Sequence, residues 1–133
     1  MNGLPSEIAV LALGSALLVI HIALQGILAT KELGVEWNAG PRDEGARPKT
    51  ALAGRAERAL RNYLETFPAL VALAAALVLA GKPGGLGAAG AWIWFAARLL
   101  YIPLYLLGIP YIRSLVWVVS VIGLALMFVA VFL

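Results

Sequence analysis

Three polar side chains with complementary chemistry lie along one predicted helix. Arg58, Asn62 and Glu65 are spaced i, i+4 and i+7, which places them within about 60° of one another at roughly 100° per residue. Arg61 is four residues from both Glu57 and Glu65, so ion pairs along the helix could neutralise part of the charge. This stripe offers guanidinium groups, an amide and a carboxylate to a shared ligand.

A second polar stripe, in the next predicted helix, adds a guanidinium group and two phenols. Arg98, Tyr101 and Tyr105 repeat the spacing of three and four residues, and Arg113 follows at the start of another helix. Arginine binds carboxylates through paired hydrogen bonds, while glutamate pairs with an ammonium group. The two stripes therefore suit a small anionic ligand that also carries an amine, such as a zwitterionic peptide.

The same side chains could instead pair with one another and hold the helices together, as polar residues in membrane bundles do. The charge balance argues against complete self-pairing. The two stripes and Arg113 contain three arginines and one glutamate. Self-pairing would leave positive charge at bilayer depth, where it favours an anion or water.

The composition is that of an integral membrane protein. The 133 residues are 62% hydrophobic and 13% charged, whereas soluble domains average about 45–50% apolar and about 25% charged residues. The chain has no cysteine and only one histidine and one aspartate, which argues against a disulfide, a metal site or a Ser-His-Asp triad. The basic residues form no stacking platform for bases, so we expect no nucleic-acid partner. Any strong nucleophile must come from a ligand.

Hydrophobic segments predict one all-α domain of four transmembrane helices. Residues 8–30 carry no charge and are long enough to cross a hydrocarbon core of roughly 30 Å. The second helix has a polar first half and an apolar second half, and Lys82-Pro83-Gly84-Gly85 ends it. No regular structure is expected from Glu36 to Lys49. The helices are expected at about residues 7–31, 51–81, 86–107 and 112–133, with a loop at about 32–50.

The distribution of positive charge predicts the orientation. The side that carries the 32–50 loop and the turn before Arg113 is rich in Lys and Arg, whereas the other side holds only Lys82. The positive-inside rule therefore makes the first side cytoplasmic and leaves both termini non-cytoplasmic. Met1-Asn2-Gly3 lacks the basic region and cleavage site of a signal peptide, so the first helix is expected to be retained.

The motifs R-A-L-R-N-Y-L-E-T-F-P at residues 58–68, Arg98-x-x-Tyr101-x-x-x-Tyr105 and Arg113-Ser114 resemble the MAPEG family, the membrane-associated proteins in eicosanoid and glutathione metabolism. The resemblance covers essentially the whole chain. The sequence is most similar in type to bacterial members, which implies a location in the bacterial inner membrane. It implies a four-helix bundle that forms a homotrimer. It also implies glutathione as the cosubstrate, bound between neighbouring subunits at the cytoplasmic side.

The resemblance further implies roles for the matching residues. Arg113 would lie beside the glutathione sulfur, where a guanidinium group favours the nucleophilic thiolate, and Ser114 would be a second donor. Tyr101 and Tyr105 would close the pocket from the adjacent subunit, and Lys31 resembles the basic end of the first helix in eicosanoid synthases. The residues expected to bind glutathione are Arg58, Arg61, Asn62, Glu65, Arg98, Tyr101, Tyr105 and Lys31.

Two departures from the family pattern leave the substrate open. Tyr101 matches some branches but differs from the histidine of the prostaglandin E branch, and Trp117 is bulky where a substrate would pass. The principal interpretation is a glutathione transferase or peroxidase that acts on a lipophilic electrophile. The alternative is a non-catalytic scaffold that holds a lipid or glutathione. His21 could relay protons, contact a ligand or hydrogen-bond across helices.

Overall fold

The computed structural model describes residues 3–133, and it is entirely α-helical over its regular segments. Met1 and Asn2, on which the expectation about a signal peptide partly rests, lie outside the described residues. Within the described range, four of the helices are long and apolar enough to cross a membrane. The helices are α1 (Ser6–Leu33), α2 (Val35–Ala39), α3 (Ala51–Leu79), α4 (Gly85–Leu106) and α5 (Ile112–Phe132).

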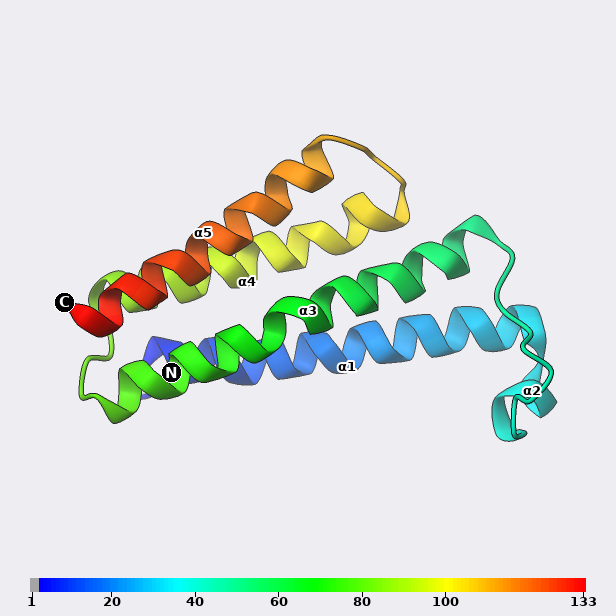
Figure 1. The fold of residues 1–133 in the computed structure, drawn as a ribbon, viewed down its shortest axis with the longest axis horizontal. Helices are drawn as coiled ribbons and strands as arrows, with labels where there is room; N and C mark the ends of the chain where they lie inside the picture. The colour runs from blue at the N-terminus through cyan, green and yellow to red at the C-terminus, as the bar shows by residue number, and fades with distance from the viewer. Residues whose placement is uncertain (1–2) are drawn as a thin grey trace.

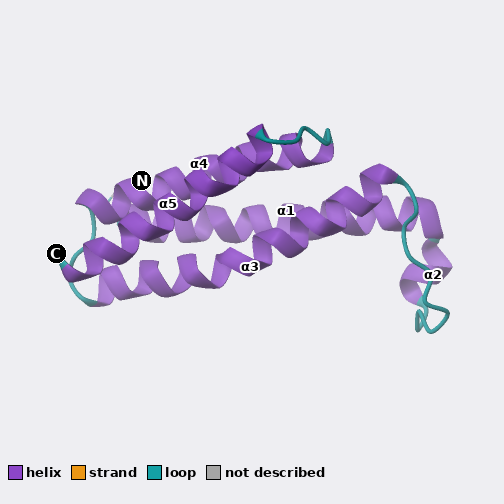
Figure 2. Ribbon diagram, turned by 45° about the horizontal axis from the view of Figure 1, so that its top comes forward, coloured by secondary structure: helices purple, strands orange, loops and turns teal. Residues whose placement is uncertain are grey.

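The four long helices run up and down in two pairs. Helix α1 lies beside α3, and α4 lies beside α5, with consecutive long helices antiparallel (Figure 1). A second view shows the same arrangement, with both chain ends and the α3–α4 turn at one end of the bundle and α2 at the opposite end (Figure 2). We call these the terminal end and the α2 end. The ends of the long helices differ from the sequence prediction by at most two residues.

The short helix α2 corrects the expectation of an irregular loop. Gly34 adopts φ 97°, which ends α1 and lets the chain restart as a helix at Val35. The Asn38 side chain donates to the Thr30 hydroxyl at 3.0 Å, and Arg42 donates to the Asn38 side-chain oxygen at 2.7 Å. Backbone hydrogen bonds from Asn38 and Gly40 close the helical turn, and the side-chain contacts join α2 to α1 and to the loop that follows. Hydrophobic periodicity carries no signal of these contacts.

The loop after α2 is held at its base. The Glu32 carboxylate accepts hydrogen bonds from the backbone N–H groups of Lys49 and Thr50, each at 2.7 Å. The Thr50 hydroxyl then accepts from the Ala53 N–H at 3.4 Å and caps α3. The end of α1 and the start of α3 are thereby joined directly, although the loop between them is long.

Close packing and hydrogen bonds to backbone hold the terminal end together. Gly90 and Gly123 bring α4 and α5 into backbone contact, since a Cβ built on Gly123 would lie 2.6 Å from the Gly90 carbonyl oxygen. The buried Glu7 carboxylate accepts from the Gly84 N–H at 2.8 Å, and Lys82 donates to the Val131 carbonyl at 2.8 Å. Both charged side chains at this end therefore have backbone partners.

Candidate functional site

A cavity of about 290 Å³ lies between α3 and the α4–α5 pair. Three different helices supply its walls, so it exists only in the folded bundle. Hydroxyl, amide and guanidinium groups dominate the lining, in contrast to the apolar groove between α4 and α5. The residues that line it are Asn62, Tyr101, Tyr105, Arg113, Ser114 and Trp117.

Arg98 joins the two polar stripes behind this cavity. Its guanidinium group is fully buried and donates to the Asn62 side-chain oxygen at 2.8 Å. The same group lies over the Tyr101 ring, with 4.5 Å between the guanidinium carbon and the ring centroid. Its Nε and Nη2 atoms have no hydrogen-bond partner in the described chain. Arg98 thus fixes Asn62 and Tyr101 and brings a positive charge close to the cavity, with no ion pair within 4 Å in the described chain.

Arg113 projects from the first turn of α5, where the exposed N–H groups of a helix also favour an anion. Its guanidinium carbon lies 4.7 Å from the centroid of the Tyr105 ring, and the residue is half-buried. No residue between 3 and 133 forms an ion pair with it within 4 Å. Arg113 can therefore stabilise a negative charge that a ligand places in the cavity.

The remaining members of the α3 stripe lie on the surface of the single chain. Arg58, Arg61 and Glu65 are exposed and do not line the cavity that contains Asn62. Arg61 forms the expected ion pair with Glu57 at 3.4 Å. Glu65 pairs with no cation within 4 Å in the described part of the chain, so the alternative pairing with Arg61 does not form.

Comparison with known protein families identifies a match over nearly the whole chain. The MAPEG family model matches residues 8–133, which include all five helices except the first two residues of α1. The chain belongs to the MAPEG family. No curated protein and no solved structure matches the chain.

MAPEG membership and the structure together confirm the four-helix membrane fold predicted from the sequence. The protein is an integral, multi-pass membrane protein related to glutathione or eicosanoid metabolism. Within residues 3–133, no group of three or more His, Asp and Glu side chains is placed to hold a metal ion.

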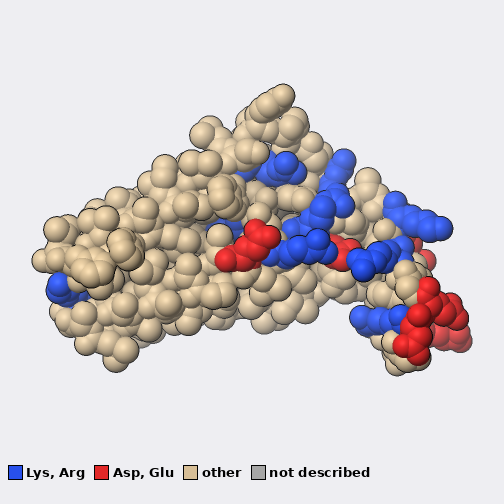
Figure 3. Space-filling model, in the orientation of Figure 1, with Lys and Arg blue, Asp and Glu red and all other residues tan. Residues whose placement is uncertain are grey.

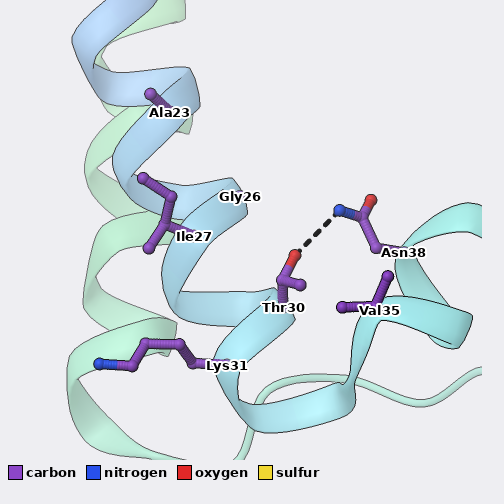
Figure 4. Close-up of a pocket in the computed structure, with 7 residues that line it drawn as sticks. All are labelled: Ala23, Gly26, Ile27, Thr30, Lys31, Val35 and Asn38. Atoms are coloured by element: carbon purple, nitrogen blue, oxygen red, sulfur yellow. Dashed lines mark hydrogen bonds between the residues drawn. The ribbon is translucent and has the colours of Figure 1, made fainter.

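Lys31 of this MAPEG protein lies apart from the cavity. It is exposed and lines a groove between the end of α1 and α2, together with Ile27, Val35 and Asn38 (Figure 4). This groove is on the side of α1 away from the buried Gly14, Leu17 and His21 face that packs in the bundle. In one chain, the structure therefore does not bring Lys31 together with Arg113.

His21 does not form the cross-helix hydrogen bond that we considered. The imidazole is buried with its ring centroid 4.8 Å from that of Tyr63, and its Nε2 has no partner among the described residues. The Tyr63 hydroxyl donates to the Gly14 carbonyl instead. His21 is therefore a packing partner of Tyr63, which the sequence analysis did not single out.

Arg55, in the first half of α3 toward the α2 end, was not among the residues expected to bind glutathione. It is half-buried and donates from Nη1 to the Leu106 carbonyl oxygen at 3.2 Å. Its spacing could have placed it near the site, because Arg55 precedes Asn62 by seven residues and therefore shares its face of α3. Periodicity alone could not reveal that its partner is a backbone carbonyl at the end of α4.

Proposed function

We propose that this MAPEG protein binds glutathione at the cytoplasmic side of the membrane and activates its thiol for attack on a lipophilic electrophile. It would thus be a glutathione transferase or peroxidase. The observation that carries the proposal is the arrangement at Arg113: a half-buried guanidinium group without an ion-pair partner in the described chain, facing Tyr105 beside a polar cavity.

Arg113 would supply the main catalytic effect. A guanidinium group beside the sulfur stabilises the thiolate relative to the thiol and so lowers the pKa of the bound thiol. The Ser114 hydroxyl, next along the same helix, is a second donor to that charge. The thiolate sulfur then forms a bond to the electrophilic atom, and the displaced group leaves with the electron pair of the broken bond.

The exposed α3 stripe supports a proposal about assembly. Arg58, Arg61 and Glu65 would complete the glutathione site against a neighbouring subunit of a homotrimer, because in one chain they are exposed and do not line the cavity. Their chemistry fits the ends of a zwitterionic peptide, with arginine for the carboxylates and glutamate for the amine. Lys31, exposed on the far side of α1, would likewise meet glutathione only across a subunit boundary.

We also propose that the α2 end faces the cytoplasm, with the protein in the bacterial inner membrane. Lys and Arg side chains gather toward that end of the surface (Figure 3). Cytoplasmic loops of membrane proteins carry an excess of such residues. The orientation would bring a water-soluble peptide to the polar cavity and a lipophilic electrophile from the bilayer.

A second candidate function is a non-catalytic scaffold that binds a lipid or glutathione. The apolar groove of about 330 Å³ between α4 and α5 favours it, because this groove could hold an acyl chain without help from the polar residues. An unpaired arginine beside a cavity is not needed for lipid binding, and this favours the enzyme.

Calorimetric titration of the purified full chain with glutathione, beside a thiol-free analogue and a screen of lipophilic electrophiles, tests the proposal. Saturable binding and turnover of at least one electrophile are expected. Binding without turnover across the screen would favour the scaffold. Absence of binding would refute the proposal and assign the polar stripes to interhelical contacts.

A further inference from the structure

Two hydrogen bonds connect α3 to α4 on either side of the cavity. One runs from Arg98 to the Asn62 side chain, and the other runs from Arg55 to the Leu106 carbonyl. Arg55 and Asn62 are seven residues apart on α3, and Arg98 and Leu106 are eight apart on α4. Because the helices are antiparallel, the contacts form two successive cross-links, with that of Arg55 nearer the α2 end.

The Arg55 guanidinium group also packs against the turn that leads into α5. A Cβ built on Gly108 would lie 2.7 Å from the Arg55 guanidinium carbon, so only glycine admits this contact without a shift. Gly108 adopts φ 70°, which also favours glycine. Arg55 therefore donates to the Leu106 carbonyl at the end of α4 and packs against Gly108, the second residue of the turn.

Backbone hydrogen bonds hold the first half of the turn to α4, from the Gly108 N–H to the Tyr105 carbonyl at 3.0 Å and from the Ile109 N–H to the Leu104 carbonyl at 3.1 Å. The second half, next to α5, has no such bond to α4 among the described residues. Tyr111 adopts φ 56° and ψ −61°, the strained γ-turn conformation, and is 86% exposed, so no burial stabilises this geometry. Arg113 follows two residues later. A displacement of the turn would thus move Arg113 relative to Tyr105, which is anchored on α4.

We propose that Arg55 is a positioning residue that fixes Arg113 at the cavity by holding the α4–α5 turn through Leu106 and Gly108. Arg55 itself lines no part of the cavity. The catalytic consequence rests on the proposed function. The structural consequence does not, and the two can be measured separately.

The structural arm uses the absence of native cysteine. Spin labels on Leu52→Cys and Ile112→Cys, both at exposed positions of 46% and 55%, report the distance between the start of α3 and the residue before Arg113. Adding Arg55→Ala is expected to broaden and lengthen the distance distribution. The matched control is Arg47→Ala, which removes an exposed arginine whose one ion pair, with Glu57 at 3.9 Å, is at the surface and contributes little. It should leave the distribution unchanged. An unchanged distribution in Arg55→Ala would overturn the proposal, whether or not the protein is an enzyme.

The catalytic arm separates positioning from binding and from general destabilisation. Arg55→Ala should lower kcat about 10- to 100-fold, the scale of a misplaced catalytic group, with glutathione affinity changed less than twofold. The thiol pKa of bound glutathione, followed by thiolate absorbance, should rise. Arg55→Lys keeps a donor for Leu106 and should recover part of the loss. Equal losses of affinity and kcat, or an unchanged thiol pKa, would overturn the proposal.

Gly108→Ala provides an independent variant, because it disturbs the same contact from the other side. Combined with Arg55→Ala, it should add less broadening of the label distances than it causes alone, because the clash with Arg55 is gone and only the strain of alanine at φ 70° remains. Full additivity would mean that the two residues act on the turn separately, contrary to the proposal.

Discussion

The two ends of the bundle use charged residues differently. At the terminal end, Glu7 and Lys82 each bind a backbone group, and glycines close the space between α4 and α5. At the α2 end, Arg98 is buried with unpartnered donor atoms and Arg113 forms no ion pair with the described residues. The α2 end also has charged side chains with backbone partners, Glu32 and Arg55. The difference is that only the α2 end adds arginines without an ion-pair partner among the described residues, and these are available to a ligand.

The largest expected effect that separates the two ends is on turnover. Arg113→Ala should reduce glutathione-dependent turnover on the order of 10²- to 10³-fold, as the loss of one donor to developing charge typically does. Glutathione affinity, measured by calorimetry, should remain within a few-fold. Turnover equal to that of the unaltered protein would remove Arg113 from the mechanism.

Variants in the exposed α3 stripe should change the affinity for glutathione, unlike variants at the terminal end. Arg58→Ala or Glu65→Gln should weaken glutathione binding by about 1.5–3 kcal/mol, the scale of a charge-assisted hydrogen bond. Titration of each variant, with Arg47→Ala as an exposed control outside the stripe, measures the effect. If both variants bound glutathione as tightly as the unaltered protein, the groups that bind the peptide would lie elsewhere.

At the terminal end, the expected effect is on stability alone. In Gly123→Ala, the new methyl group would meet the Gly90 carbonyl and the Trp94 N–H at 2.6 and 2.8 Å, so the helices must separate. Overpacking of this kind costs about 1–3 kcal/mol. The apparent Tm in detergent should fall while glutathione affinity per folded protein is retained. A loss of glutathione affinity without a loss of stability would show that the terminal end also contributes to ligand binding.

The smallest expected effect is that of Glu7→Gln. The amide oxygen can still accept from the Gly84 N–H, so only the strength of a charged acceptor is lost, about 1 kcal/mol or less. A small decrease in apparent Tm with unchanged turnover is expected. A large change in turnover would show that Glu7 has a role beyond holding the α3–α4 turn.

Hydrophobic length and periodicity were sufficient to predict the four spans and the two polar stripes, because both depend only on spacing along a helix. They could not predict the contacts between helices. Asn62 meets Arg98, whereas Arg58 and Glu65 on the same stripe stay exposed. That difference depends on the rotation of α3 against α4, which no single-helix pattern specifies.

Local chemistry between polar side chains and backbone was the other part that the sequence did not reveal. Helix α2 and the contact of Arg55 with Leu106 depend on hydrogen bonds to a specific partner, 51 residues away in the second case. Residue type shows that a side chain can donate. Only the fold shows which carbonyl is within reach.

The hydrogen bonds of Glu32 to Lys49 and Thr50 have a consequence for how this protein can be altered. Since they join the two ends of the α2 loop, the geometry of α1 and α3 does not depend on the length of chain between them. Insertions near Asp43, an exposed position in the loop between α2 and α3, should be tolerated, as they are at exposed loop tips generally. The loop is thus a place where an epitope or a fluorescent reporter could be introduced.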